Sequence, residues 1–456
     1  MNDVPRQSTL TGALPSQVPS VHWPAVVGAR DAAVLALLFQ MESTQWLSAG
    51  ALRKQQNRQL GVLLDHARRH CAFYRERLPN GLANWHDIPL LTRTDLQTHA
   101  DAIRAATYPR AHGKTFDIAT GGSTAEPVTV RRTALTQLFW QAATLRDHLW
   151  HRRDLSATMA IIRQFPQPVD STKPERWGGI LRSGPAWHLP ISTDVQVQSR
   201  WLQGVNPDIL LTYPANLDAL LTHMRHEAVT LPRLREVRTI SGAVTPALRE
   251  QCQQVLGMPL TDLYSAQEIG VIALQCPDSG LLHVQSEHLL VEMLNKMGQP
   301  CREGEIGQVV VTDLHNFAMP LIRYALHDWA EVGPACSCGR GLPTLRRVMG
   351  RTRNMAMNPE GKLFWPVLDT KRMLNAIPQI RQYQFEQTAA DAITARLVCA
   401  PAPSSEQLQK LQATLDQMLG HAYRWAWELR EIPLPLLASG KFEEFTSSIP
   451  DSGEKA

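Results

Sequence analysis

The chain has 456 residues and a mass of 51.0 kDa, which is too long for one small core and predicts two or three packed units of roughly 150 residues each. Hydrophobic residues make up 44% and charged residues 19% of the sequence, so neither intrinsic disorder nor a fibrous repeat is indicated. The net charge of +4 at pH 7 is small for this length and does not form a concentrated basic face, which argues against a nucleic-acid partner.

Targeting signals and cysteine usage bear on the compartment. Met1 to Arg6 lacks the charged-then-apolar layout of a secretion signal, and the apolar run from Ala32 to Phe39 is too short to cross a membrane. The 7 cysteines are odd in number and irregularly spaced, which argues against a disulfide framework. We therefore expect a cytoplasmic protein without a membrane partner.

The first part of the chain predicts a tail followed by helices. Residues 1–25 mix Ser, Pro, Gln and Thr without a period, so we expect a loose tail there. From Ala32 to Arg77 apolar residues recur at helical spacing, which predicts amphipathic helices with one face on a core. Thr92, followed by Asp95 three residues later, is typical of a helix start.

Strand-like and helix-like patterns then alternate. Strands are predicted over 158–162, 209–213 and 237–240, and the last two are followed by helical patterns over 216–227 and 246–256. This alternation predicts βα units and mixed α/β layers.

A β-rich stretch and a final mixed region complete the chain. Residues 289–332 predict strands separated by a turn at Gly304 to Gly307, which indicates a smaller sheet within the first domain. A new arrangement of strands and helices follows Arg351. We expect an α/β fold with a large N-terminal domain over 26–351 and a small α+β domain over 352–456.

One loop combines glycine with hydroxyl residues. Thr120 to Pro127 can wrap phosphate oxygens, because glycine lets backbone N–H groups approach closely and Ser and Thr add donors. The candidate phosphate ligands are Thr120, Gly122, Ser123 and Thr124. The loop lacks the Lys of a P-loop, and an ordinary turn is the alternative interpretation.

Further segments follow this loop in a set order. They are Ser241 to Val244, Tyr264 to Glu268, Met319 to Asp328, Gly350-Arg351 and Ser439 to Lys441. Taken together with the loop, residues 60–445 resemble the AMP-forming acyl/aryl-CoA synthetase superfamily, specifically its phenylacetate-CoA ligase-like branch.

The resemblance implies a nucleotide site. In the family, the turn similar to Ser241, Gly242 and Ala243 contacts adenine, and the aromatic residue similar to Tyr264 packs against it. The aspartate similar to Asp328 binds both ribose hydroxyls, a role that suits a carboxylate with two acceptor oxygens. Arg351 matches an arginine that reaches the nucleotide at the start of the interdomain hinge. Without the other segments, Tyr264 and Asp328 could be a surface residue and a strand-end turn residue.

The resemblance also implies catalytic groups and a reaction. Glu268 matches a glutamate that helps to hold Mg²⁺, and Lys441 matches the lysine that stabilises the adenylation transition state. The implied reaction uses ATP to convert a carboxylic acid into acyl-AMP and then passes the acyl group to CoA or to the phosphopantetheine of an acyl carrier protein.

The acid is expected to be an aryl acid such as a hydroxybenzoate or phenylacetate. Phe139 and Trp140 follow the phosphate loop on a predicted helix and could border an apolar acid pocket, because an aromatic wall suits an aryl ring. Core packing of this helix face is the alternative.

Several positions depart from the family pattern. Gly121 and Ala125 replace a serine and a glycine in the phosphate loop, and Gln267 replaces a hydroxyl residue. His327 stands where the family has glycine, and Arg353 where the hinge commonly has aspartate.

A second inorganic site is indicated by Cys276, His283, Cys336 and Cys338, which lie near a tetrad that some members of this branch use for zinc. Thiolate and imidazole ligands in a closed set would hold a structural Zn²⁺. The alternative is that Cys276 is a small buried residue and the other two thiols are free.

Two other functions remain open at this point. An adenylating enzyme could pass the acyl group to an amine instead of a thiol. The departures from the pattern, including Ser265 beside Gln267, would also fit a degenerate, noncatalytic interaction protein stabilised by zinc.

Overall fold

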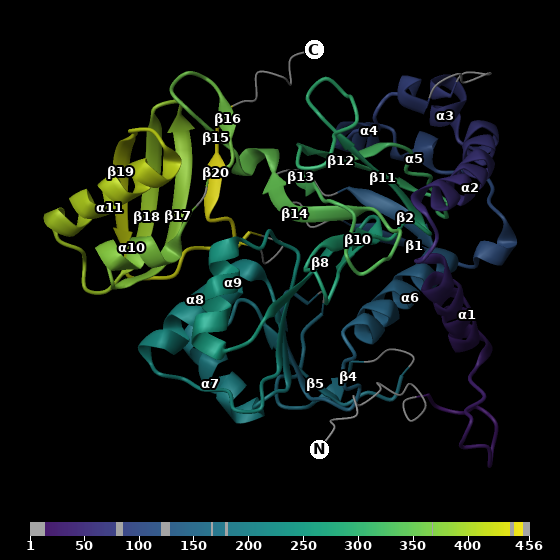
Figure 1. The fold of residues 1–456 in the computed structure, drawn as a ribbon, viewed down its shortest axis with the longest axis horizontal. Helices are drawn as coiled ribbons and strands as arrows, with labels where there is room; N and C mark the ends of the chain where they lie inside the picture. The colour runs from purple at the N-terminus through teal and green to yellow at the C-terminus, as the bar shows by residue number, and fades with distance from the viewer. Residues whose placement is uncertain are drawn as a thin grey trace. The chain divides into compact units, whose positions relative to one another are not determined.

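The computed structural model describes residues 14–78, 85–119, 128–165, 167–177, 181–366, 368–437 and 442–449, with Thr352 and Lys371 described by backbone only. The chain divides into two units, which Figure 1 shows as a ribbon. The first comprises Met1–Met159, Ser171–Trp187 and Thr261–Val348, and the second Ala160–Asp170, His188–Leu260 and Met349–Ala456. The domain boundary expected after residue 351 stays a prediction.

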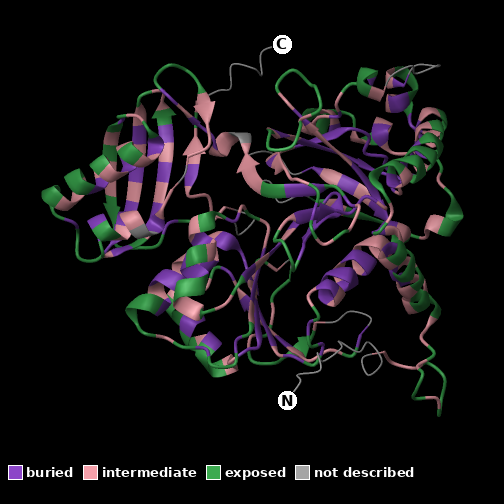
Figure 2. Cartoon of the chain, viewed as in Figure 1, coloured by how far each residue is buried: buried purple, intermediate pink, exposed green. Residues whose placement is uncertain are grey.

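The first unit begins with helices, as the apolar spacing predicts. These are α1 (Ala29–Thr44), α2 (Ala49–His70), α3 (Ala72–Arg77), η2 (Trp85–Asp87), α4 (Arg93–Thr98), α5 (Ala100–Ile103), η3 (Arg110–His112) and α6 (Ala134–Trp150). In α2, Leu60, Leu63 and Ala67 are buried on one face, while the outward face is largely exposed (Figure 2). Thr92 and Asp95 form a reciprocal capping box at the start of α4, which confirms the predicted helix start.

The large sheet of the first unit has the strand order β11-β12-β13-β14-β10-β9-β8. The strands are β8 (Leu260–Ala266), β9 (Gly270–Gln275), β10 (Leu282–Val284), β11 (Leu289–Leu294), β12 (Ile306–Asp313), β13 (Tyr324–Val332) and β14 (Thr344–Arg351). β11 with β12, β12 with β13, β10 with β9 and β8 with β9 pair antiparallel, and every residue of β9 is buried. A smaller antiparallel pair consists of β1 (Thr115–Ala119) and β2 (Thr129–Thr133), and β4 (Glu175–Arg176) pairs with β5 (Pro185–Pro190).

A bulge interrupts the pairing of β12 with β13. Gln308 lies opposite Trp329, but Val310 lies opposite Ala325, so β13 carries two extra residues in this interval. His327 within the bulge has a φ of +59°, a left-handed conformation that glycine adopts most readily. The backbone thus takes a glycine-like conformation at the position where a histidine replaces the family's glycine, and Asp328 follows directly.

The second unit contains the predicted βα units. β3 (Met159–Arg163) and β5 each straddle the boundary with the first unit, and the strand order here is β7-β6-β3-β5. β6 (Ile209–Thr212) is followed by α8 (Pro214–His226), and β7 (Glu236–Ile240) by α9 (Pro246–Leu256), while α7 (Val195–Val205) precedes β6. β6 and β7 are parallel, as expected for strands joined through a helix.

The C-terminal part of the second unit has its own sheet and core. Its elements are η4 (Thr352–Asn354), β15 (Ala356–Met357), β16 (Leu363–Phe364), α10 (Thr370–Ala376), β17 (Ile380–Ala389), β18 (Ala392–Cys399), α11 (Ser405–Leu419), β19 (Arg424–Arg430) and β20 (Phe445–Ser447). The sheet order is β19-β18-β17-β20, and buried side chains of α10 and α11 pack with those of β17 and β18 (Figures 1 and 2). The mixed α/β class, the β-rich region and the α+β C-terminal region are confirmed. Across the described ranges, each helix is too short or too polar to span a membrane.

Candidate active site

The phosphate-loop candidates Thr120, Gly122, Ser123 and Thr124 lie outside the described residues. The strands on either side are described, and Ala119 at the end of β1 pairs with Thr129 at the start of β2. The two ends of the segment between them therefore lie side by side.

Tyr264 and Asp328 are brought together in the first unit. The Tyr264 hydroxyl on β8 donates a hydrogen bond to Asp328 Oδ2 on β13 at 2.9 Å. Tyr264 is buried, and Asp328 is half-buried beside the β13 bulge. An aromatic ring and a carboxylate held in one place can contact the base and the sugar of a nucleotide, although the residues are 64 positions apart in sequence.

Glu268 lies in the tight turn between β8 and β9 and is buried. Its negative charge, together with that of Asp313, acts against the desolvation that lowers the pKa of the buried Arg132 guanidinium. Glu268 follows Tyr264 by four residues, and a buried carboxylate at this place can serve as a ligand for a hard cation such as Mg²⁺. The neighbouring Gln267, which departs from the family pattern, is exposed, and its carbonyl accepts a bond from Arg132 Nη1 at 3.4 Å.

Ser241, Gly242 and Ala243 belong to the second unit and directly follow β7. Ser241 has a φ of +64°, so the chain turns sharply at this point. The turn lies at the carboxyl end of β7, whose parallel neighbour β6 ends at Thr212. Ligands of open α/β sheets bind at the carboxyl ends of parallel strands, which is the position expected for a nucleotide-contacting turn.

Arg351 ends β14 and is counted in the second unit. Its backbone N–H donates to Asn354 Oδ1 at 3.0 Å. Arg353, at the expected hinge position, forms an ion pair with Glu443, in which Arg353 Nε lies 3.0 Å from Glu443 Oε1. Lys441, the candidate adenylation lysine, lies outside the described residues, but Glu443 two positions later is paired with Arg353.

Phe139 and Trp140 on α6 both line a small cavity of the first unit. The Phe139 ring stacks on the His315 imidazole at a centroid distance of 4.2 Å, and Arg132 lies over the Trp140 ring at 5.2 Å. The sequence interpretation missed Arg132, His288, Asp313 and His315, which also line this cavity. These four polar residues come from distant segments without a shared motif, so no sequence pattern indicates them.

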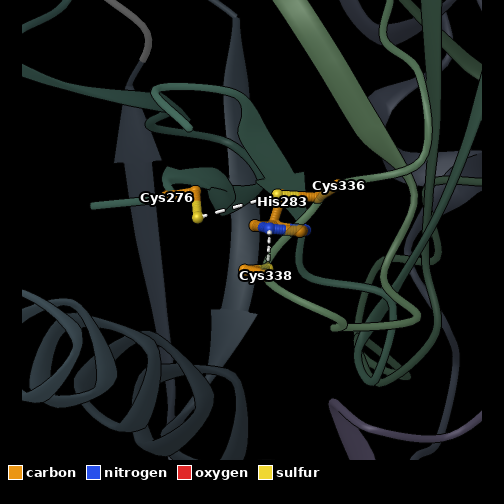
Figure 3. A group of neighbouring side chains, drawn as sticks. All are labelled: Cys276, His283, Cys336 and Cys338. Atoms are coloured by element: carbon orange, nitrogen blue, oxygen red, sulfur yellow. Dashed lines mark hydrogen bonds between the residues drawn. The ribbon is translucent and has the colours of Figure 1, made fainter. Parts of the chain in front are cut away.

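Cys276, His283, Cys336 and Cys338 converge in the first unit (Figure 3). Their ligand atoms all lie within 4.8 Å of one another, with Cys336 Sγ 3.8 Å from Cys276 Sγ and Cys338 Sγ 3.3 Å from His283 Nε2. Tetrahedral zinc with Zn–S bonds of ~2.3 Å requires sulfur atoms roughly 3.8 Å apart, so the donor set fits such an ion.

The tautomer of His283 also suits a metal ligand. His283 Nδ1 lies 3.3 Å from the carbonyl oxygen of Leu342, and because a carbonyl only accepts, Nδ1 must carry the proton of this bond. Burial lowers the pKa of His283 to about 4, which keeps the imidazole neutral. The Nε2 lone pair is thus directed to the side where the three thiols gather.

The comparisons with known proteins find related enzymes but no matching family model. The phenylacetate-coenzyme A ligase of Thermus thermophilus is 26% identical over 375 residues, covering 75% of this chain and 79% of the relative. The enzyme of the same name from Pseudomonas putida is 23% identical over 357 residues, covering 70% of this chain and 74% of the relative.

Solved structures show the shared fold. A crystal structure of 2-hydroxyisobutyryl-CoA ligase in the postadenylation state, in complex with R3-HIB-AMP, matches with a TM-score of 0.68 at 16% identity, covering 88% of this chain and 90% of that chain. An anthranilate CoA ligase in complex with anthranoyl-AMP matches with a TM-score of 0.53 at 16% identity, covering 72% and 65%. These relatives and this fold support the adenylate-forming superfamily, and the chain is similar in sequence to its phenylacetate-CoA ligases.

Proposed function

We propose that this chain activates a carboxylic acid with ATP as acyl-AMP and then transfers the acyl group to a thiol. The observation that carries the proposal is the hydrogen bond between Tyr264 and Asp328, because it unites the residues assigned to adenine and to ribose. Relatives that are named phenylacetate-coenzyme A ligases support the same reaction class.

The first step forms the acyl-adenylate. A carboxylate is a poor electrophile, so it must first acquire a good leaving group. A carboxylate oxygen attacks the α-phosphorus of ATP in line, the bond from that phosphorus to the bridging oxygen breaks, and pyrophosphate leaves with the electron pair. Lys441 neutralises the charge that develops on the phosphoryl oxygens.

The other nucleotide contacts follow from the family positions. We assign the phosphates to Thr120, Gly122, Ser123 and Thr124, and the adenine to Ser241, Gly242 and Ala243. Arg351 reaches the nucleotide from the end of β14. Glu268 holds Mg²⁺, which supplies charge neutralisation at the phosphates when it is bound.

The second step forms the product. A thiol attacks the acyl carbon of the mixed anhydride, AMP leaves with the electron pair, and the thiol proton passes to solvent. CoA or the phosphopantetheine of an acyl carrier protein would supply the thiol. We propose that residues 352–456 form the small domain that rotates about Arg353 between the steps.

For the acid we propose an aryl acid, and for the Cys/His tetrad a structural Zn²⁺. Phe139 and Trp140 would face the aryl group. Three thiolates and one neutral imidazole in a closed set leave no open position for a substrate, so the ion would stabilise the fold rather than act in catalysis.

The test is ATP–pyrophosphate exchange with a panel of aryl and alkyl acids. We expect exchange that depends on one acid class, followed by thioester formation when CoA or a holo carrier protein is added. Offering amines in parallel separates amide formation from thioester formation. Absence of exchange with every acid, together with no ATP binding by calorimetry, would instead identify a noncatalytic member.

A further inference from the structure

The cavity next to Phe139 has a polar lining. It lies between α6, the start of β9 and the segments that follow β10 and β12, and its volume is ≈ 10 Å³, roughly the space of one water molecule or one hydroxyl group. Gly270 lines it with a φ of +109°, and a Cβ on this residue would lie 3.5 Å from both Arg132 Nη2 and the Trp140 ring. The glycine therefore keeps this space open.

His288, which lines the cavity, has an unused acceptor. Its side chain is 4% exposed, and Nε2 lies 3.2 Å from the carbonyl oxygen of Val271, so Nε2 carries the proton of that bond. Burial lowers the pKa of His288 to about 3, so the ring is neutral and Nδ1 is a lone-pair acceptor. Among the described residues, nothing donates to Nδ1.

His315 adds a second imidazole to the same wall. Its Nδ1 is buried and lacks a hydrogen-bond partner in the described part of the chain, and burial lowers the pKa of its ring to about 3. The Phe139 ring stacks on it at 4.2 Å and fixes the plane of the imidazole.

Arg132 adds hydrogen-bond donors to a cavity in which the imidazoles offer acceptors. It is 1% exposed, and over the described ranges three of the five N–H groups of its guanidinium have acceptors, all at 3.3 to 3.4 Å: the Thr136 hydroxyl, the Thr136 carbonyl and the Gln267 carbonyl. The other two N–H groups have no acceptor among the described residues, although Asp313, which also lines the cavity, and Glu268 act on the guanidinium charge.

These groups define which ligand atom fits. The imidazole Nδ1 atoms require a donor, so an ether, a halogen or a methyl group would leave them unpaired. The guanidinium charge disfavours an ammonium group, and the buried carboxyl group of Asp313, which also lines the cavity, disfavours a second carboxylate. A hydroxyl group donates one hydrogen bond, accepts another and has the size of the cavity.

We propose that this cavity binds a hydroxyl group of the carboxylic acid, with His288 Nδ1 accepting its hydrogen bond and Arg132 donating one to its oxygen. The inference rests on the proposed adenylation function and narrows its substrate class to hydroxylated acids. His288 and His315 are then specificity-determining residues, while Phe139 positions His315.

The experiment compares acids that differ by one hydroxyl group, using ATP–pyrophosphate exchange. The pairs are benzoate with each hydroxybenzoate, phenylacetate with each hydroxyphenylacetate, and isobutyrate with 2-hydroxyisobutyrate. We expect kcat/KM for at least one hydroxylated acid to exceed that of its parent by about 100-fold, because a site built around a hydroxyl rejects the analogue that lacks it.

Two variants of His288 distinguish the loss of its Nδ1 acceptor from general damage to the fold. His288→Gln keeps an amide nitrogen near the Nε2 position, which can still donate to the Val271 carbonyl, but has no acceptor at the Nδ1 position. His288→Asn places its amide oxygen near the Nδ1 position. We expect His288→Gln to reduce the 100-fold preference to within about threefold of unity, and His288→Asn to keep at least about a tenfold preference.

The matched control is His112→Gln. His112 is also an imidazole of the first unit with an unpartnered, buried Nδ1, but it does not line the cavity. Its variant should keep the full preference for the hydroxylated acid.

Each outcome decides the inference. Equal kcat/KM for parent and hydroxylated acids, or a preference that His288→Gln leaves unchanged, would mean that the cavity holds only a water molecule. Exchange with the parent acids alone would overturn the inference while preserving the adenylation function. Absence of exchange with all acids would overturn that function and this inference with it.

Discussion

At the scale of single residues, the site depends on hydrogen bonds between groups that are far apart in sequence. Asp328 is one of them: its carboxylate accepts from the Tyr264 hydroxyl, and its position follows a bulge in which His327 takes a left-handed conformation. If Asp328 binds the ribose as proposed, the Tyr264 hydroxyl orients its carboxylate and leaves the second oxygen to the sugar, so we expect the bond to matter more for binding than for folding.

Tyr264→Phe removes that hydroxyl and keeps the ring. We expect the Kd for ATP to rise about three- to tenfold, the equivalent of about 1 kcal/mol, because Asp328 loses its orientation. Isothermal titration with ATP measures the change. Tyr423→Phe is the control, since it removes a hydroxyl that donates to the Met357 carbonyl at 3.1 Å. Equal shifts in the two variants would contradict the assigned role.

The buried imidazoles predict a pH dependence of stability. Burial lowers the pKa of His288 and of His315 to about 3, below the ordinary value of 6.5 in the unfolded chain. Between these values the unfolded state binds more protons, so the free energy of unfolding falls as the pH falls from about 6.5 toward 3, by at most ~1.4 kcal/mol per pH unit for each ring.

Urea unfolding between pH 7 and pH 4.5 measures this slope. His288→Gln removes one of the two rings, and the slope should decrease by the share of one imidazole. His22→Gln changes an exposed histidine and should leave the slope as it is. A slope that is the same in all three proteins would show that His288 is protonated as easily in the folded state as in the unfolded one.

At the scale of elements, one ion pair connects two segments of the C-terminal region. The Arg353–Glu443 pair links η4 to the segment before β20, and both side chains are largely buried, with exposures of 21% and 15%. Arg353 stands at the proposed hinge position, and its charge has a partner in Glu443.

A double-mutant cycle tests this link. Arg353→Ala and Glu443→Ala should each lower the stability of the protein, and their effects should be non-additive by about 1 kcal/mol, because each residue is the other's partner in a partly desolvated place. Urea unfolding of the four proteins gives the coupling. The Arg424–Asp391 pair is the control: it is much more exposed and should show no measurable coupling. Additive effects of the two substitutions would show that Arg353 and Glu443 do not stabilise the protein through their ion pair.

The loop between β13 and β14 carries Cys336 and Cys338, two of the four proposed zinc ligands. We expect about one zinc per chain by elemental analysis, and Cys338→Ser should lose it and lower the Tm by several degrees, since metal binding contributes directly to folding. Cys301→Ser changes a free cysteine outside the tetrad and should retain zinc and Tm. A wild-type protein without stoichiometric zinc would refute the assignment.

At the scale of the whole molecule, the proposed function predicts that its two half-reactions use different parts of the chain. Lys441→Ala should reduce ATP–pyrophosphate exchange by about 100-fold or more and reduce thioester formation from supplied acyl-AMP far less, because the lysine stabilises charge only in the adenylation transition state. Arg430→Ala, on the exposed end of β19, is the control and should leave both rates unchanged. An equal loss in both half-reactions would show that Lys441 acts in another way.

The sequence by itself determined the class of the fold and the order of the segments that carry its chemistry. Apolar spacing in α2, the capping signal at Thr92 and the alternation around β6 and β7 are local, because propensity and periodicity act within one element. The sequence also predicted that Cys276, His283, Cys336 and Cys338 form a group, and their ligand atoms lie within 4.8 Å of one another, while the zinc itself stays a prediction.

Only the tertiary structure decided what those segments share. The packing of β8 on β9 and of α6 beside β9 brings Arg132, His288 and His315 to one cavity, and the bulge in β13 turns Asp328 to the Tyr264 hydroxyl. Such proximity depends on long-range packing and on the burial that sets each group's charge, and neither leaves a periodic trace in the sequence.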